Sequence, residues 1–146
     1  MKVPACSDKM YTLHHAVDLS PGDLEDIREL YIEAGWLAPG DDLSFLAPAI
    51  AGASVALVAR EDGRIIAFGR ALSDGCSDAY IQDVVVSSRC RKRGIGGAVV
   101  MLLAEELRKK GCDWIGLVGE PGTEKFYADL GFQAQKGYTL WKIPKK

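Results

Sequence analysis

Hydrophobic and polar residues follow two periods along this chain, and each change of period marks the boundary of an expected element. Residues 20–35 carry apolar side chains at helical spacing behind a Ser-Pro start, which predicts a first helix. Residues 96–110 show the same spacing, and lysines followed by Gly111 end that helix. Shorter helices are expected at 41–51 and 122–130.

Segments rich in Val, Ile and Leu lie between turn signals and predict the strands. Glu61-Asp62-Gly63-Arg64 is a hairpin signal. The strand–helix–strand order across 79–118 implies a right-handed crossover between two parallel strands. Val84-Val85-Val86 shows no alternation, which is typical of a strand covered on both faces. The expected strands are 11–17, 54–60, 64–72, 79–86, 114–118, 132–135 and 138–143.

Size and composition narrow the function classes. The chain has 146 residues, 48% of them apolar, which suits one domain over 1–146. A net charge of −2 gives no global field toward nucleic acid or membrane. Four cysteines, at positions 6, 76, 90 and 112, form no C-x-x-C pair, so we expect no metal site. Scattered thiols, no signal peptide and no long apolar run predict a cytoplasmic protein.

A basic, glycine-rich loop separates the valine-rich strand from the helix that follows it. Gly94, Gly96 and Gly97 leave room for an anion to approach bare N–H groups, and the helix start adds its positive dipole end. Arg91 and Arg93 offer charge-assisted bonds. The order predicts a phosphate site. The alternative is a turn that merely starts a helix beneath a solvated basic patch.

Two motifs carry a family resemblance. The first is Val84-Val85-Val86 followed by Arg91-Lys92-Arg93-Gly94-Ile95-Gly96-Gly97. The second, about thirty residues later, is Lys125-Phe126-Tyr127-Ala128-Asp129-Leu130-Gly131-Phe132. With the helix and strand expected between them, they resemble the GNAT superfamily of N-acetyltransferases over nearly the whole chain. The resemblance implies a mixed, mostly antiparallel twisted α/β (α+β) sheet of six to seven strands, with a central splayed parallel pair and about four flanking helices.

The resemblance also implies acetyl-CoA as cosubstrate and no metal. In the family, loop amides hold the pyrophosphate of the coenzyme, and the preceding strand pairs its backbone with the pantetheine arm, which enters where the parallel pair splays. Carried over to this chain, the coenzyme-binding residues are Val84, Val85, Val86, Arg91, Lys92, Arg93, Gly94, Ile95, Gly96, Gly97 and Tyr127.

The chemistry points to two side chains. Tyr127 occupies the position where the family commonly places a hydroxyl near the coenzyme sulfur, and the alternative is a packing tyrosine. Asp83 either orients or deprotonates an amine, or it pairs with an arginine. Gln82 stands where the similar strand of glucosamine-phosphate N-acetyltransferases usually has Glu, and an amide is no base. A bulge in this strand would break the side-chain alternation.

The sequence says least about the residues that would bind the acceptor substrate. Tyr31, Trp36 and Gln82 are the candidate substrate contacts, and Glu120 either faces the substrate or is solvated. The resemblance implies direct transfer, in a ternary complex, to a primary amine of a small molecule, a peptide N-terminus or a lysine. No nucleic-acid or membrane partner is expected, and a homodimer is left open. The alternative function is a non-catalytic acyl-CoA-binding sensor or interaction module.

Overall fold

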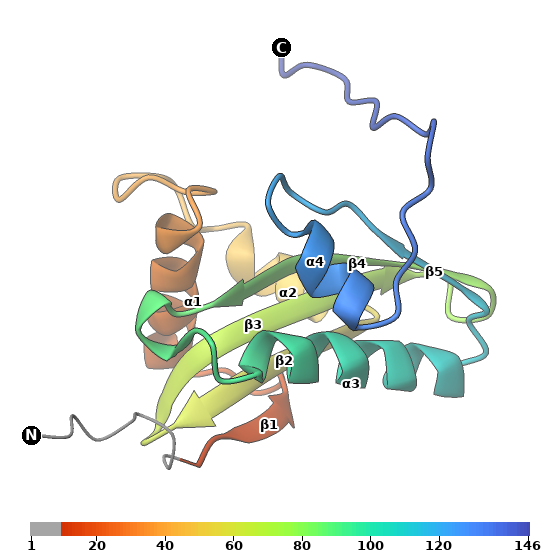
Figure 1. Cartoon of the computed structure of the whole chain (residues 1–146). Helices are drawn as coiled ribbons and strands as arrows, with labels where there is room; N and C mark the ends of the chain where they lie inside the picture. The colour runs from red at the N-terminus through yellow and green to blue at the C-terminus, as the bar shows by residue number, and fades with distance from the viewer. Residues whose placement is uncertain (1–9) are drawn as a thin grey trace, which may run out of the picture.

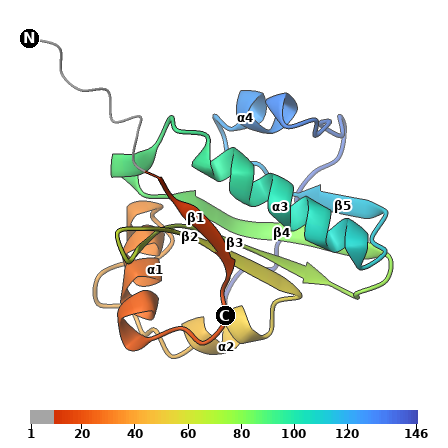
Figure 2. The ribbon, with the colours of Figure 1, turned by 90° about the horizontal axis from the view of Figure 1, so that it is seen from below.

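One mixed sheet forms the centre of the protein, and helices cover both of its faces (Figures 1 and 2). The computed structural model describes residues 10–146. The strands are β1 Thr12–His15, β2 Val55–Glu61, β3 Arg64–Ser73, β4 Asp78–Val86 and β5 Trp114–Leu117. The helices are α1 Pro21–Glu33, α2 Leu46–Ala51, α3 Ile95–Lys109 and α4 Glu124–Asp129, with a 3₁₀ turn at Ser88–Cys90.

The strands lie across the sheet in chain order, β1-β2-β3-β4-β5. β1 to β4 pair antiparallel, whereas β4 and β5 are parallel and are connected through α3. This confirms the expected parallel pair and the helix that connects it. Helices α1 and α2 lie on one face, with α3 and α4 on the other (Figure 2). Within residues 10–146 no helix combines the length and the apolar character that crossing a bilayer requires.

The sheet has fewer strands than the sequence predicts. Residues 132–135 and 138–143 form no strand, so the expectation of six to seven strands is wrong, and the sheet of the described chain has five. The aromatic and β-branched residues of 138–143 carry β propensity, but a strand also needs a neighbour, and this segment pairs with none. Figure 1 shows the C-terminal trace leaving the body of the protein. The large apolar side chains it exposes are Tyr138, Leu140, Trp141 and Ile143.

The second helix is shorter than the expected range of 41–51, because aspartates at its start form turns instead. The Asp41 carboxylate accepts a hydrogen bond from the Ala38 N–H at 2.8 Å, and the Asp42 carboxylate accepts one from the Ser44 N–H at 3.0 Å. Such local bonds compete with helical ones. The helix therefore begins only at Leu46.

Helix α1 begins as predicted and is tied to the sheet at its first turn. The Ser20 hydroxyl accepts from the Asp23 N–H at 3.1 Å, and the Ser20 N–H donates to the Asp23 carboxylate at 3.0 Å, which forms a capping box. The Arg60 guanidinium of β2 donates two bonds to the same carboxylate, at 2.8 and 2.9 Å. One side chain thus both caps the helix and fixes it to β2.

Apolar clusters fill both faces of the sheet, and one glycine sets the distance of α3. A Cβ at Gly69 of β3 would lie 2.8 Å from Val99 Cγ1 and 3.1 Å from Leu103 Cδ1. Val99 and Leu103 are fully buried against the sheet. The close approach of α3 to β3 therefore requires glycine at this position.

Asp23→Asn is expected to lower the free energy of unfolding by about 1–2 kcal/mol at pH 7, because it weakens both the cap and the pairing with Arg60. The Arg60 guanidinium, followed by the Ser20 N–H, holds the pKa of Asp23 well below its ordinary value. A lowered pKa stabilises the folded state fully above about pH 4 and progressively less as the pH falls toward the shifted value.

The measurement is urea denaturation of both proteins from pH 3 to pH 7. The gap between wild type and Asp23→Asn should narrow below about pH 4. Glu25→Gln, in the same helix but on the exposed Glu25–Arg28 pair, is the control and should change stability by less than about 0.5 kcal/mol. A gap that is constant across the pH range would contradict the role of the Asp23 charge.

Candidate active site

A cleft opens where β4 and β5 diverge. The parallel pairing runs from Asp78 opposite Trp114 to Ile81 opposite Leu117 and ends there, while β4 continues to Val86. The edge of β4 beyond Ile81 is therefore not paired with β5. The end of this pairing agrees with the splay that the family resemblance implies. The cleft has a volume of about 420 Å³, and its lining residues are Trp36, Tyr80, Ile81, Gln82, Asp83, Val84, Val118, Glu120, Thr123, Tyr127 and Leu140.

A bulge in β4 positions the centre of this cleft. Phe68 pairs with Val85 and Arg70 pairs with Gln82, so the single residue Gly69 lies opposite both Asp83 and Val84. Asp83 takes a left-handed conformation with φ 56°, which aspartate tolerates better than most residues. The bulge changes which residues of β4 direct their side chains toward α3. The side chains that pack in the α3 cluster are Ala79 and Ile81 before the bulge and Val84 and Val86 after it.

Two donors hold the Asp83 carboxylate. The Tyr31 hydroxyl and Arg70 Nε each donate to Asp83 Oδ2 at 2.8 Å. Burial, followed by the charge of Asp83, raises the pKa of Tyr31, so its phenol is a neutral donor. Tyr31 is only 5% exposed and does not line the cleft. The Tyr31 hydroxyl therefore orients the Asp83 carboxylate from a buried position outside the cleft.

A second acidic side chain faces the cleft. Trp36 Nε1 donates to Glu120 Oε1 at 3.0 Å and joins the segment after α1 to the connection between β5 and α4. The Tyr31 ring contacts Trp36 edge-on, with centroids 5.2 Å apart. Glu120 is exposed to solvent and lines the cleft, so it lies where a substrate could reach it. In the sequence the only signal was an acid directly after a strand end, and its partner lies 84 residues away.

Tyr127 reaches the cleft from α4. Its ring packs edge-on against Phe132, with centroids 5.9 Å apart, and the side chain is half-buried. Burial raises the pKa of Tyr127 above its ordinary value, and the charge of Glu120 raises it further. The hydroxyl therefore remains protonated at neutral pH and can act as a donor.

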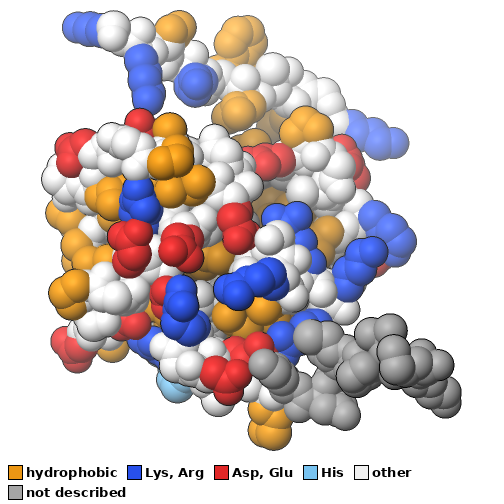
Figure 3. Space-filling view, turned by 90° about the vertical axis from the view of Figure 1, so that its left-hand side faces the viewer, with side chains coloured by type: hydrophobic (Ala, Val, Ile, Leu, Met, Phe, Trp, Pro, Cys, Tyr) orange, Lys and Arg blue, Asp and Glu red, His pale blue; other side chains and the backbone are white. Residues whose placement is uncertain are grey.

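The loop after β4 has the open geometry expected of an anion site. Lys92 and Gly94 have φ values of 62° and 77°, and Gly94 caps α3 without a side-chain hydrogen bond. The first intrahelical bond runs from the Ala98 N–H to the Gly94 carbonyl, so the N–H groups of the first turn lack an intrahelical acceptor. Arg91 and Lys92 are exposed. Figure 3 shows the molecule from the side on which α1 and the loop after β4 lie in Figure 1, and basic and acidic side chains adjoin on that face.

Arg93 differs from its basic neighbours because its side chain is anchored in the protein. The guanidinium donates to the Glu61 carboxylate of β2 at 2.6 Å, and the two side chains are only 12% and 11% exposed. Its Cζ atom also lies over the Tyr11 ring, 6.0 Å from the ring centroid. Arg93 thus fixes the loop to the sheet.

Two of the loop glycines serve packing. A Cβ at Gly96 would lie 3.3 Å from Val86 Cγ2 and 3.4 Å from Phe126 Cζ, and one at Gly97 would lie 3.2 Å from Leu130 Cδ2. Gly94, by contrast, has nothing within 4 Å of that position. Gly96 and Gly97 therefore let α4 approach the start of α3, which positions Tyr127 beside β4.

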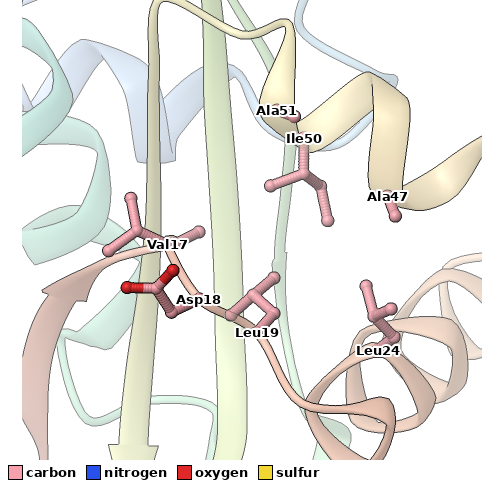
Figure 4. Close-up of a pocket in the computed structure, with 8 residues that line it drawn as sticks. Val17, Asp18, Leu19, Leu24, Ala47, Ile50 and Ala51 are labelled. Carbon is pink, nitrogen blue, oxygen red and sulfur yellow. The ribbon is translucent and has the colours of Figure 1, made fainter.

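A second hollow, of about 410 Å³, lies between the β1–α1 connection and α2 (Figure 4). Asp18 is the one titratable residue in a lining that is otherwise apolar: Ala16, Val17, Leu19, Leu24, Ala47, Ile50 and Ala51. No group of acid, base or donor side chains converges there. We therefore place the candidate active site at the β4–β5 cleft.

The structure brings five of the predicted site residues together in the cleft. Trp36, Gln82, Asp83, Val84 and Tyr127 line the cleft, and residues 91–97 follow β4 after the 3₁₀ turn and include the start of α3. The side chains of Val85 and Val86 pack in the two apolar clusters on opposite faces, which confirms that this strand is covered on both sides. Among the described residues no group of His, Cys, Asp or Glu side chains is arranged to hold a metal ion.

Comparisons with known proteins agree with this geometry. The sequence profile of the acetyltransferase (GNAT) family matches residues 22–132. The chain is 46% identical over 70 residues to a chloroplastic protein of Oryza sativa subsp. japonica, serotonin N-acetyltransferase 2, with 48% of this chain and 35% of that protein covered. It is 39% identical over 62 residues to glucosamine 6-phosphate N-acetyltransferase of Trypanosoma brucei brucei, with 42% of each chain covered.

The fold is also that of a solved protein. A crystal structure of a probable acetyltransferase from Staphylococcus aureus superimposes with a TM-score of 0.78 at 18% identity, over 94% of this chain and 100% of that one. The chain spans 35% and 42% of the length of the two curated relatives. Because the rice relative is chloroplastic, the cytoplasmic location expected from the sequence stays a prediction.

Arg93→Ala is expected to lower the free energy of unfolding by about 3 kcal/mol, because it leaves the nearly buried Glu61 carboxylate without its cation. Arg91→Ala, two residues away and exposed, should change it by less than about 0.5 kcal/mol. Urea denaturation followed by tryptophan fluorescence measures both. Equal effects of the two substitutions would contradict the anchoring role of Arg93.

Proposed function

The chain belongs to the GNAT acetyltransferase family, and we propose that it is an acetyl-CoA-dependent N-acetyltransferase that acetylates a primary amine by direct transfer in a ternary complex. The observation that carries the proposal is the cleft where the pairing of β4 with β5 ends, with Asp83 and Tyr127 in its lining. We further propose that residues 1–146 act as one acetyltransferase domain.

The loop of residues 91–97 is proposed to bind the coenzyme diphosphate. Its N–H groups and the start of α3 favour an anion, and the exposed side chains of Arg91 and Lys92 add charge. Arg93 contributes through its backbone, because Glu61 engages its guanidinium. The unpaired edge of β4 at Val84–Val86 suits the amides of the pantetheine arm, which would bind there like an added strand.

Transfer requires the amine nitrogen to attack the thioester carbonyl carbon, after which the C–S bond breaks and the sulfur leaves with the electron pair. We assign Tyr127 the role of donor to that sulfur. Its raised pKa keeps the phenol neutral, so it stabilises the thiolate by a hydrogen bond and supplies a proton to it. The position of Tyr127 beside Glu120, Thr123 and the open edge of β4 supports this assignment.

Asp83 is proposed to orient the amine and to receive its proton. An alkylamine is neutral in less than about one molecule in a thousand at pH 7, so a base or a relay through water is needed. The bonds from Tyr31 and Arg70 fix Asp83 within the cleft. Gln82 lines the cleft beside it and offers its amide for hydrogen bonding to the acceptor.

Two of the relatives have names that support a small-molecule acceptor, whereas another, 30% identical over 84% of this chain, is named a histone acetyltransferase. One relative is named for serotonin and another for glucosamine 6-phosphate, and both compounds carry a primary amine. They differ in charge and shape, so the class of amine has to be inferred from the cleft of this chain.

Tyr127→Phe is expected to lower kcat by about 10- to 150-fold while leaving the Kd for CoA unchanged, because a hydrogen bond to a charged group contributes about 1.5–3 kcal/mol. Thiol release from acetyl-CoA in the presence of an amine panel gives kcat, and isothermal titration gives Kd. Tyr138→Phe, at an exposed tyrosine outside the cleft, is the control and should leave both unchanged.

An unaltered kcat in Tyr127→Phe would remove Tyr127 from the mechanism. CoA binding without thiol release for every amine tested would instead favour the alternative function, a non-catalytic acyl-CoA-binding module. Failure of CoA to bind at all would overturn both.

A further inference from the structure

Glu120 is the charged group of the cleft for which the transfer chemistry has no use. It lies in the connection between β5 and α4 and lines the cleft together with Asp83. No lysine or arginine lines the cleft, so its charged lining is wholly acidic. We infer that Glu120, positioned by Trp36, binds the ammonium group of the acceptor and makes the enzyme specific for cationic amines that have an apolar body and no acidic group. This inference rests on the proposed function.

The two carboxylates of the cleft differ in what neutralises them. Asp83 is paired with the guanidinium of Arg70 at 2.8 Å. Glu120 forms no ion pair with any residue of the described chain, and its side-chain donor is the neutral indole of Trp36. Glu120 therefore carries the uncompensated negative charge of the cleft, and an ammonium ion is the ligand that compensates it.

The contact with Trp36 prepares the carboxylate for such a ligand. An ionised carboxylate has about four acceptor sites, and the indole N–H occupies only one of them. The bond restricts the Glu120 side chain, so less conformational freedom is lost when a ligand binds. Trp36 is in turn held edge-on by the buried ring of Tyr31. Tyr31 thus supports both acidic residues, Asp83 through its hydroxyl and Glu120 through Trp36.

The charge of Glu120 also acts on the catalytic side of the cleft. Glu120 and Tyr127 both line the cleft, and the charge of Glu120 adds to the effect of burial in raising the pKa of Tyr127. An amine bound at Glu120 would accordingly enter close to the group that we assign to the leaving sulfur. Binding and transfer then occur in one continuous space rather than at two separate sites.

The rest of the lining suits an apolar body. Trp36, Tyr80, Val118 and Leu140 present aromatic and aliphatic surface to the cleft. Tyr80 is 50% exposed and packs against Trp114, with ring centroids 5.1 Å apart. A volume of about 420 Å³ lies within the range of small-molecule sites. An acceptor that bore a carboxylate beside its amine would bring that charge toward the uncompensated carboxylate of Glu120 and be repelled.

The test compares 2-phenylethylamine with phenylalanine, which differ by one carboxylate. Wild type is expected to prefer the amine by at least about 100-fold in kcat/KM. Glu120→Gln should raise KM for the amine about 10- to 150-fold, because it removes a charge-assisted bond, and should reduce the preference by a similar factor without changing the Kd for CoA. Trp36→Phe keeps the ring, removes the N–H and should give a smaller change of the same sign.

Glu124→Gln, four residues from Glu120 on exposed α4, is the matched control and should behave as wild type. Isothermal titration of 2-phenylethylamine into the CoA complex gives a readout that does not depend on turnover. Amine binding that weakens in Glu120→Gln while no thiol is released would support the inference and overturn the proposed function. If Glu120→Gln is active with an unchanged KM and an unchanged preference for 2-phenylethylamine over phenylalanine, the inference alone is overturned. The same holds if the substitution leaves the Kd for the amine unchanged.

Discussion

The extra residue that β4 accommodates at Asp83 is the constraint on which the rest of the structure depends. Because two residues of β4 lie opposite Gly69, the side-chain alternation shifts, and Val84 and Val86 pack against α3 in line with Ile81. The left-handed backbone at Asp83 accompanies a carboxylate that Tyr31 and Arg70 hold in the cleft. The same stretch of β4 is where pairing with β5 ends, so one local irregularity produces the packing, the acidic group and the opening together.

Glycines allow the helices on either side of the site to pack closely. Gly69 admits α3 to the backbone of β3, and Gly96 and Gly97 admit α4 to the first turn of α3. The conformation of the loop itself depends on Gly94 and on the bond between Arg93 and Glu61. Packing therefore connects the loop, the bulge and Tyr127. The position of each of these parts restricts where its neighbour can lie.

Local signals account for most of what the sequence predicts correctly. The Ser20 cap, the Asp62-Gly63 turn and the crossover through α3 depend on neighbours within a few residues or on chain order, and all are present. The strands expected at 132–135 and 138–143 are absent because a strand depends on a partner that its own residues do not reveal. The side-chain partners of Arg93 and Glu120 escaped prediction for a related reason: these partners, Glu61 and Trp36, lie 32 and 84 residues away.

The bond between Arg93 and Glu61 joins the loop to β2, near the far end of the sheet from β5. The folded hairpin of β2 and β3 therefore stabilises the shape of the loop through this bond. Any ligand that recognises the assembled loop would consequently shift the folding equilibrium of the entire sheet, by about 2.7 kcal/mol at a free concentration one hundred times its dissociation constant. Resistance to heat and to proteolysis in this protein should therefore follow the cellular supply of that ligand.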